Sequence, residues 1–600
     1  MAESLLLITI GPVQEFIASA RRTRDLWFGS WLLSELSREA ALYLSDAKVG
    51  GRLIFPHGHE QLQDRSVDVV NRIMAVLPNH EQANDVANGI DQAVRTRLTK
   101  IRDEAFAQIP GLRDIAVRER AETQVAELLE LYWVVVPFEG DYQVGREALE
   151  AALAARKNTR SFGQPGYSAA EPKSSVDGQR ESVVPETKYP ARGDDVAQKA
   201  VKIAALFKQY GAGQAERLSG VDLLKRHGLR SDGRGDFPST SHFAALPLLS
   251  RLEQSFSQEA ARRWSEYLTT LGPLVNLYEL GNQRTSLPIV GRYDASLLFE
   301  ERLAELTTND NEQKTAVHAL RHFLQAFTGG KPPEPYYALL HADGDNMGRV
   351  IDHLAAKGVE QHRAFSRQLD IFARSVRATV ESANHRGALI YAGGDDVLAF
   401  LPLDTALGCA ADLAERFRTM MQPFTITVDG KSIAPTLSAG LAICHHIEPL
   451  SDALNLARRA EKEAKQIEGK DALAIILSKR SGVDTLIKGR WTDGFVQRLM
   501  DATTLHSSEA LPDGAAYDLR DLDVRLTHGN NTPNQALLAK EAVRILKRKR
   551  GNRGQTELPQ HFLDDVAAAL QNGRSTRQLA DELVVAREFA RARGLQKEQS

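Results

Sequence analysis

Residues 388–401 read ALIYAGGDDVLAFL, and this stretch decides the fold. Two apolar runs of strand length flank four residues of glycine and aspartate, which is the pattern of a tight β-hairpin. The glycines Gly393 and Gly394 allow the chain to reverse over a short distance. The pattern therefore predicts a hairpin that carries Asp395 and Asp396 at its tip.

A second acidic turn precedes this hairpin in the sequence. Residues 336–342 form another strand-like apolar run, and Asp343, Gly344 and Asp345 follow it before a helix-like segment begins at Arg349. A strand that ends in carboxylates, beside a hairpin tipped with carboxylates, can hold divalent cations between them. Asp-Gly is also the commonest turn chemistry, so residues 343–345 taken alone favour an ordinary polar turn.

The two turns together indicate a two-metal nucleotidyl-transfer site. Mg²⁺ prefers hard oxygen ligands, usually one or two carboxylates with substrate phosphates and water. Two such ions, about 3.5–4 Å apart, activate an attacking hydroxyl and stabilise the leaving pyrophosphate. We expect two Mg²⁺ or Mn²⁺ ions at the carboxylates Asp343, Asp345, Asp395 and Asp396. Asp345 is the weaker candidate, because it can instead fix the turn.

The elements around these turns predict a ferredoxin-like sheet. Apolar residues at helical spacing follow the first turn over 362–384 and the hairpin over 405–421. A strand over 436–443, a helix over 450–467 and a strand over 472–477 complete the unit. This architecture is that of polymerase palms and nucleotide cyclases.

The N-terminal part predicts a second domain of the same kind. Strands are expected over 4–10, 52–55 and 131–138, with helices over 12–46 and 69–131. Residues 11–14, at the place of the acidic turn, are Gly-Pro-Val-Gln, so only one palm is expected to be catalytic. The fold class is therefore α+β, with two palm-like domains and helical domains between and after them. Expected boundaries are 1–160, 161–330, 331–484 and 485–600.

Composition agrees with a cytoplasmic protein without a membrane span. The chain has 600 residues, a net charge of −3 and 42% hydrophobic residues, and no uninterrupted apolar run reaches the roughly 18 residues of a transmembrane helix. The two cysteines, Cys409 and Cys444, lie in apolar contexts and are expected to be packed thiols. Basic residues gather at Arg21, Arg22 and Arg24, and again at Arg544, Lys547, Arg548, Lys549, Arg550 and Arg553. Each cluster is either an RNA contact or a solvated helix face.

The motifs resemble a known family. Residues 336–480 are similar to the GGDD palm of the large subunit of type III CRISPR-Cas effector complexes. The opening segment 8–30 resembles the signature of the Cmr (III-B) subtype, and residues 216–226 and 237–240 are further matches.

This resemblance implies an RNA-guided sensor that acts with other Cmr subunits, a guide CRISPR RNA and a target RNA. Target binding would switch on the palm, which would make cyclic oligoadenylate from ATP. Some members instead join an adenylyl group to another metabolite.

The resemblance also implies roles for single residues. Asp343, Asp395 and Asp396 match the catalytic, metal-binding carboxylates. Residues expected at the nucleotide are Gly344, Gly393, Gly394, Ser438 and Lys465. Of these, Ser438 would face the base and Lys465 would meet the triphosphate.

Two departures from the family, and two rival functions, complete the prediction. No His-Asp dipeptide occurs, so DNA cleavage at an HD site is not expected. Ser174 and Asp177 stand where a zinc module would have cysteines, so no structural zinc is expected. A cyclic-dinucleotide synthase would usually carry GGDEF or GGEEF, whereas Val397 follows Asp396 here. A catalytically silent scaffold of the same complex is the other alternative.

Overall fold

The computed structural model describes residues 2–594 except the segments 59–61, 66, 160–170, 230–236, 273, 276–279, 281–290, 292, 306–308, 481, 528–534 and 549–556, and except the side chains of residues 256 and 257. Residues 161–170, the first part of the expected second domain, therefore lie outside the described residues. The same is true of Lys549, Arg550 and Arg553 in the C-terminal basic cluster.

The N-terminal domain is built on a four-stranded antiparallel sheet. Its strands are β1 (Glu3–Gly11), β2 (Arg52–Phe55), β3 (Arg72–Leu77) and β4 (Glu130–Phe138). They lie in the order β2-β3-β1-β4, which is the order of a ferredoxin-like fold. Apolar residues of α2 (Thr23–Leu44) and α4 (Ala83–Phe106) cover one face. The other face packs against α6 (Tyr142–Asn158).

Two sequence predictions for this domain were wrong. The helix expected over 12–46 is divided into α1 (Gln14–Ala18) and α2. Between them the ammonium of Lys225 donates hydrogen bonds to the carbonyls of Phe16 and Ser19, which therefore bond a side chain instead of the next helical turn. The region 69–131 was expected to be largely helical but contains β3. A short continuous apolar run fits a buried strand and a buried helix equally well.

The second domain has six strands. They are β5 (Tyr336–Asp345), β6 (Ala388–Gly393), β7 (Asp396–Pro402), β10 (Thr436–His445), β11 (Ala472–Leu477) and β12 (Thr485–Arg490). The order is β12-β11-β10-β5-β7-β6, so the first four in chain order repeat the arrangement of the N-terminal sheet. The α+β class is confirmed.

Helices cover both faces of this sheet. The helices α13 (Val359–Val380) and α14 (Leu403–Met421) pack on one face. On the other face, α15 (Leu450–Lys465) lies along β10 and β5. A Cβ atom on Gly440 of β10 would lie 2.2 Å from the backbone nitrogen of Glu461, so the helix and the strand touch without an intervening side chain.

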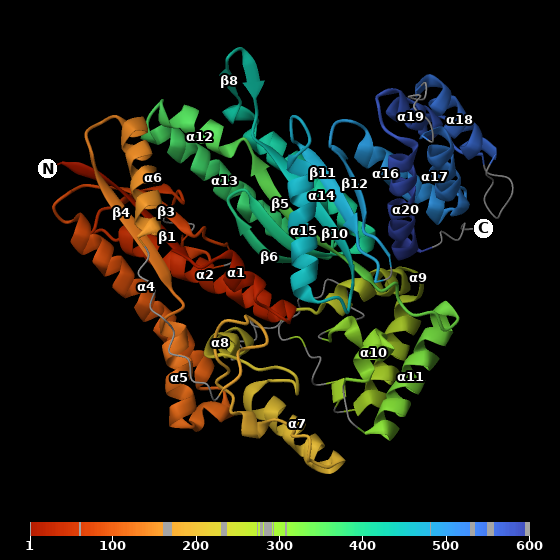
Figure 1. Ribbon diagram of the computed structural model, residues 1–600, viewed down its shortest axis with the longest axis horizontal. Coiled ribbons are helices and arrows are strands. Elements are labelled where there is room, and N and C mark those ends of the chain that lie inside the picture. Colours follow the sequence, from red (N-terminus) through yellow and green to blue (C-terminus); the bar gives the residue numbers. More distant parts are fainter. Residues whose placement is uncertain are drawn as a thin grey trace.

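Two features of the palm were missed. The tail after residue 484 was expected to be helical, but β12 pairs with β11 as the edge strand of the palm sheet. A short hairpin of β8 (Ile426–Val428) and β9 (Lys431–Ile433) extends from the domain (Figure 1). Both are short or half-exposed strands whose apolar pattern is weak.

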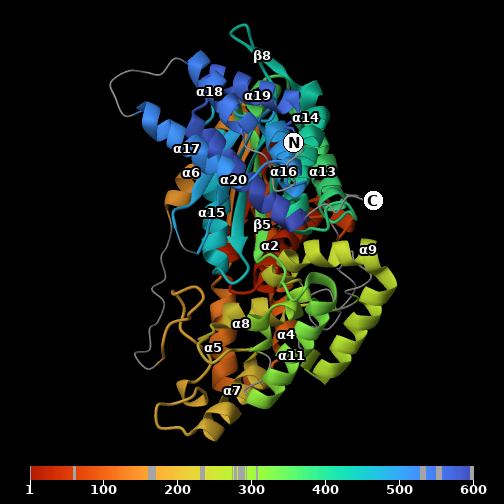
Figure 2. The same ribbon diagram turned by 90° about the vertical axis from the view of Figure 1, so that its right-hand side faces the viewer.

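Helical groups fill the rest of the chain. The helix α5 (Ile115–Ala126) precedes β4. Between the two sheets in the sequence come α7 (Val196–Tyr210), α8 (Gly220–His227), α9 (Thr240–Leu271), α10 (Glu300–Leu303) and α11 (Asp310–Thr328). After the second sheet come α16 (Phe495–Ser507), α17 (Gly514–Thr527), α18 (Gln535–Arg548), α19 (Gln560–Gln571) and α20 (Thr576–Arg593). The C-terminal group and the group α9–α11 lie one above the other beside the palm (Figures 1 and 2). No described helix is long and apolar enough to cross a membrane.

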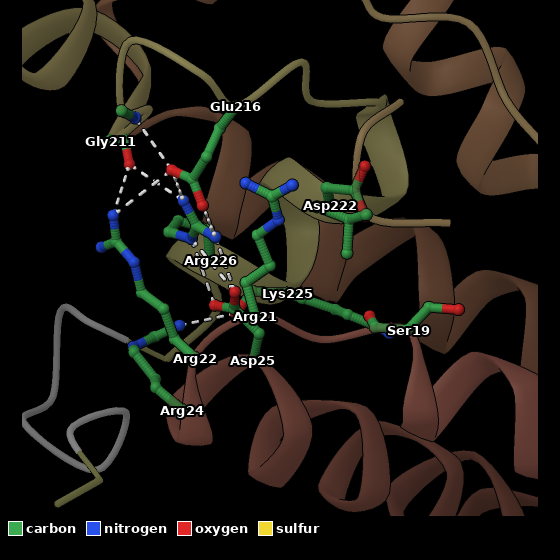
Figure 3. A network of polar contacts seen from close by, with 12 residues as sticks. Ser19, Arg21, Arg22, Arg24, Asp25, Gly211, Glu216, Asp222, Lys225 and Arg226 are labelled. Carbon is green, nitrogen blue, oxygen red and sulfur yellow. Dashed lines mark hydrogen bonds and ion pairs between the residues drawn. The ribbon is translucent and has the colours of Figure 1, made fainter. Parts of the chain in front are cut away.

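A buried charge network joins two of the segments that resemble the family, 8–30 and 216–226 (Figure 3). Arg226 of α8 forms ion pairs with Asp25 of α2 at 2.7 Å and with Glu216 at 2.9 Å. Burial alone would raise the pKa of Asp25, but Arg226 holds it below its usual value. Arg24 is also buried, with its guanidinium on the carbonyls of Lys225 and Gly228, so it is not a solvated surface cation. Segments 20–25 and 216–226 are therefore one structural unit.

The two cysteines and the degenerate zinc-module segment have simple packing roles. Cys409 and Cys444 are buried free thiols, as expected. The Ser174 hydroxyl donates to Asp222 at 2.7 Å and accepts the backbone N–H groups of Val176 and Asp177. Hydrogen bonds thus hold the turn in which the family pattern would have thiolates.

Candidate nucleotidyl-transfer site

The acidic hairpin has the tight turn that its sequence predicts. Gly393 pairs with Asp396, so Gly394 and Asp395 form the two-residue tip between β6 and β7. Gly394 has φ of +66°, a conformation that favours glycine. A Cβ atom on Gly393 would lie 1.7 Å from the hydroxyl of Tyr391. Both glycines are therefore needed to build this tip.

Asp395 packs directly on the other acidic turn. A Cβ atom on Gly344 would lie 2.5 Å from Oδ2 of Asp395, and the Gly344 N–H hydrogen-bonds the Asp395 carboxylate. Glycine at position 344 thus lets the hairpin tip touch the end of β5. The contact brings together acidic turns that are 50 residues apart in the sequence, and Asp343 and Asp395 line the same cavity of about 900 Å³.

Lys465 neutralises Asp343. Its ammonium forms an ion pair with Oδ2 of Asp343 and lies 3.3 Å from Oε1 of Glu461, one helical turn earlier on α15. It also donates to the Gly344 carbonyl at 3.4 Å. Burial, and then the charge of Lys470, lowers the pKa of Lys465 to about 8. The lysine predicted from the sequence therefore reaches the acidic turn.

Asp345 ties three strands together. Its Oδ2 accepts hydrogen bonds from Ser438 at 2.7 Å, from Thr436 at 2.9 Å and from the backbone N–H of Asp471 at 3.1 Å. Its Oδ1 is buried and has no hydrogen-bond partner among the described residues. Ser438 is fully buried, with its hydroxyl on Asp345. In this arrangement Asp345 holds the end of β5 to β10 and β11, and Ser438 acts on the site through Asp345.

The carboxylates of the hairpin are hard to ionise together. Burial, and then the charge of Asp345, raises the pKa of Asp395. Asp396 keeps an exposed edge at the start of β7, yet loss of surrounding water, and then the charges of Asp395 and Glu461, raise its pKa as well. A cation placed between carboxylates that raise each other's pKa reduces their mutual repulsion.

The cavity also has a positive side that sequence reasoning missed. The helix α12 (Met347–Ala355) begins immediately after the acidic turn, and its first residues line the cavity with Lys470 and Arg490. The N-terminus of a helix offers unpaired N–H groups to anions. The helix-like segment that follows Asp345 in the sequence already indicated that a helix begins at this place. The positions of Lys470 and Arg490 carried no signal, because they reach the site only through the packing of β11 and β12.

Comparisons with known proteins agree with this geometry. Residues 336–474 match the family model "Cas10/Cmr2, second palm domain", and residues 5–103 match "CRISPR-associated protein Cmr2, N-terminal". The matches thus place these two segments in the Cas10/Cmr2 family. These models cover β2, β3 and most of β1 in the N-terminal sheet, and β5, β6, β7, β10 and the first half of β11 in the palm sheet.

Individual relatives give the same family. The CRISPR system Cmr subunit Cmr2 of Pyrococcus furiosus is 39% identical over 178 residues, which cover 26% of this chain and 19% of that protein. The chain thus matches about a fifth of that relative's length.

Among solved structures, the apo state of type III-B Cmr-beta gives a TM-score of 0.66 at 14% identity, covering 94% of this chain and 78% of that one. Cmr-beta bound to cognate target RNA gives 0.60 at 14% identity, with coverages of 93% and 79%. At this identity the two structures support the fold.

The donor set fits a divalent cation that is shared with a substrate. In the part of the chain that the structure describes, no three His, Cys, Asp or Glu side chains are placed to hold an ion by themselves. Mg²⁺ needs only one or two carboxylates when substrate phosphates complete its shell. Asp343 and Asp395 meet that requirement beside an anion-binding helix terminus. The orphaned Oδ1 of Asp345 is a further hard oxygen of this turn, but it is buried and does not line the cavity.

Proposed function

We propose that this chain is the nucleotidyl cyclase of an RNA-guided type III-B antiviral complex and that it makes cyclic oligoadenylate from ATP. The observation that carries the proposal is the contact of Asp395 with Gly344. It brings two acidic turns together in one cavity, opposite a helix N-terminus and basic side chains. Carboxylates for cations and donors for a triphosphate are the two requirements of this chemistry.

Each group has a role in this proposal. Asp343, with Asp395 at the tip and Asp396 at the start of β7, would hold two Mg²⁺ or Mn²⁺ ions, and Asp345 would position the end of β5. When bound, these ions supply activation of the attacking hydroxyl and stabilisation of the leaving pyrophosphate. The protein binds and orients the substrate with groups that are already in place.

The nucleotide-binding groups are assigned by position. The N–H groups at the start of α12, together with Lys470 and Arg490, would bind the triphosphate. Of the three glycines expected at the nucleotide, Gly344 lines the cavity, whereas Gly393 and Gly394 shape the hairpin tip. Lys465 would pass from Asp343 to a phosphate oxygen. Ser438 would act as a positioning residue through Asp345, instead of facing the base.

The proposed partners are other Cmr subunits, a guide CRISPR RNA and a target RNA, in the cytoplasm. The support is the family match of the two segments and the fold shared with Cmr-beta, one of whose structures holds cognate target RNA. A gated enzyme needs a resting state. A hundredfold rise in activity requires target RNA to favour the competent state by about 2.7 kcal/mol.

The test is the double variant Asp395→Ala Asp396→Ala in the assembled complex. With radiolabelled ATP, Mn²⁺ and complementary target RNA, we expect product to fall at least about a thousandfold while the complex still assembles. The Asp395→Asn Asp396→Asn variant keeps the shape of the tip and should also lose activity, because the charge is what binds the cation. Undiminished product from either variant would contradict the catalytic assignment.

The same assay separates the alternatives. Mass spectrometry of the product distinguishes a cyclic oligoadenylate from an adenylyl group joined to another metabolite. A complex that assembles on target RNA but forms no product with wild-type protein would be a silent scaffold. Equal output without RNA, with complementary RNA, and with RNA that also pairs to the guide's repeat-derived tag would remove RNA gating and leave the nucleotidyltransferase.

A further inference from the structure

A second cavity, of about 910 Å³, lies away from the acidic site. It is enclosed by segments from the N-terminal domain, the helical region and the palm. The α1–α2 connection contributes Arg21 and Arg22, the α9–α11 group contributes Arg302, and the palm contributes residues 446–451, where β10 turns into α15. This volume is in the range of pockets that hold a small organic ligand.

The charged groups of this cavity favour an anion. Arg21 is exposed and donates one hydrogen bond, at 3.2 Å, to the carbonyl of Ser175. The helix α15 starts at the cavity wall, and its N-cap residue, Pro449, gives no side-chain hydrogen bond to the first turn. The positive end of that helix therefore adds to the arginines.

Carboxylates of the wall are already engaged. Asp294 accepts hydrogen bonds from the backbone and hydroxyl of Ser239, which caps α9. Glu305 forms an ion pair with Arg302 at 3.1 Å. Glu448 is the third carboxylate of the cavity wall. The wall also contains four arginines, one of which is the buried Arg24.

A buried hydroxyl gives independent evidence for a ligand. Ser296 lines the cavity and is 1% exposed, yet its Oγ has no hydrogen-bond partner among the described residues. A buried hydroxyl without a partner costs free energy, and a bound polar group would satisfy it.

The remaining wall suits a nucleobase. Phe207 of α7 lines the cavity and is 48% exposed, which is unusual for a phenyl ring. Apolar atoms of Ile447 and Leu450 lie on the palm side of the same cavity. Aromatic rings beside arginines are the usual surface for an unpaired base and its phosphates. We propose that this cavity binds a nucleotide, with its phosphates at Arg21, Arg22 and the start of α15 and its base against Phe207.

The cavity is connected to the acidic site by two rigid elements. β10 runs from Thr436, which hydrogen-bonds Asp345, to His445 beside the cavity. The helix α15 runs from Leu450 in the cavity wall to Lys465, which pairs with Asp343. A nucleotide in the cavity therefore contacts the start of α15 and the segment 446–449 that follows β10. The link between the bound nucleotide and the acidic turn rests on the proposed function, whereas nucleotide binding itself does not.

The test uses the full chain in EDTA and a short single-stranded RNA with a fluorescein label and one 4-thiouridine. We expect Arg21→Ala to weaken binding about tenfold, and Arg21→Glu to weaken it further, because one charged contact to phosphate is lost or reversed. Phe207→Ala should also weaken binding through loss of base stacking. The control is Arg192→Ala, since Arg192 is an exposed arginine just before α7 that does not line the cavity.

Cross-linking then locates the ligand and its source. Irradiation should attach the RNA to peptides that contain Phe207 or residues 446–451. A parallel arm with 8-azido-ATP tests free nucleotide as the source. Cross-links at these peptides from RNA, from the ATP analogue or from both support the site and identify its ligand. Cross-links only elsewhere, or equal affinity of Arg21→Glu and wild type, would overturn it. The Asp395→Ala Asp396→Ala variant should bind unchanged, so failure of the cyclase proposal is observed separately.

Discussion

Gly344→Ala is the sharpest test of the acidic site, because the structure gives the size of the disturbance. The new Cβ would lie 2.5 Å from Oδ2 of Asp395 and 2.7 Å from its Cβ. Ordinary carbon contacts are about 3.5–4.0 Å, so one side must move by about 1 Å. A rotamer change moves the carboxylate but not the Cβ of Asp395. The hairpin tip therefore has to separate from β5.

The expected effects follow from that displacement. Overpacking of this kind costs about 1–3 kcal/mol of unfolding free energy, so the protein should still fold. A reacting group misplaced by about 1 Å costs about a hundredfold in rate. Misorientation of a metal ligand costs about 10- to 100-fold in metal affinity. We therefore expect weaker Mn²⁺ binding in the absence of nucleotide and about hundredfold less product.

Gly348→Ala is the matched control. Gly348 lines the same cavity from α12, but a Cβ atom there would meet nothing within 4 Å. Alanine in a helix is favoured over glycine by up to about 1 kcal/mol, so this variant should be at least as stable as wild type. Mn²⁺ affinity is measured by electron paramagnetic resonance of the free ion, and stability by denaturant unfolding. If Gly344→Ala is folded and binds Mn²⁺ as tightly as Gly348→Ala, the contact of the two turns has no role in holding a cation.

Two further predictions concern the contact between the domains. The Tyr142 hydroxyl lies 2.7 Å from Nδ1 of His362, and burial, then Arg146 and Arg72, lowers the pKa of His362 from 6.5 to about 4. In the unfolded chain the His362 imidazole takes up a proton below pH 6.5, whereas in the folded protein it does so only near pH 4. The free energy of unfolding should therefore fall by up to about 3 kcal/mol as the pH is lowered from 6.5 towards 4. In denaturant titrations, His362→Gln should reduce this dependence of stability on pH. Asp68→Ala should cost about 1–3 kcal/mol in the same assay by leaving the Ala392 N–H unsatisfied, whereas Asp68→Asn keeps an acceptor and should cost less.

The hairpin and its neighbours could be predicted from the sequence because their signals are local. β11 and the strands beside the Gly-Gly-Asp-Asp turn have the predicted bounds to within a residue or so. The strand β3 was missed, because its six residues look the same in a helix and in a buried strand. The break between α1 and α2 could not be predicted, because it depends on Lys225, about 200 residues away.

For the site, the sequence predicted which residues take part better than it predicted their hydrogen-bond and ion-pair partners. The resemblance predicted Lys465 and Ser438 at the nucleotide, but neither the ion pair of Lys465 with Asp343 nor the hydrogen bond of Ser438 to Asp345 was predicted. A strand pattern fixes which face a side chain occupies, whereas a hydrogen bond depends on the register between β10 and β5. Lys470 and Arg490 were missed for the same reason: they come to the cavity through tertiary packing alone.

The first four strands of the palm sheet repeat the order of the N-terminal sheet, but the connection between the second and the third strand differs in length. Between β6 and β7 there is only the tip, Gly394 and Asp395, whereas β2 and β3 are joined by the longer segment 56–71. At that connection, Phe55 and Val70 lie 3.7 and 3.8 Å from the place of a Cβ on Gly394, and Asp68 accepts the Ala392 N–H at 3.0 Å. A two-residue turn with a left-handed glycine has little to fix it on its own. The segment that joins β2 and β3 in the N-terminal domain therefore stabilises the acidic tip of the palm. The N-terminal domain itself has no such tip.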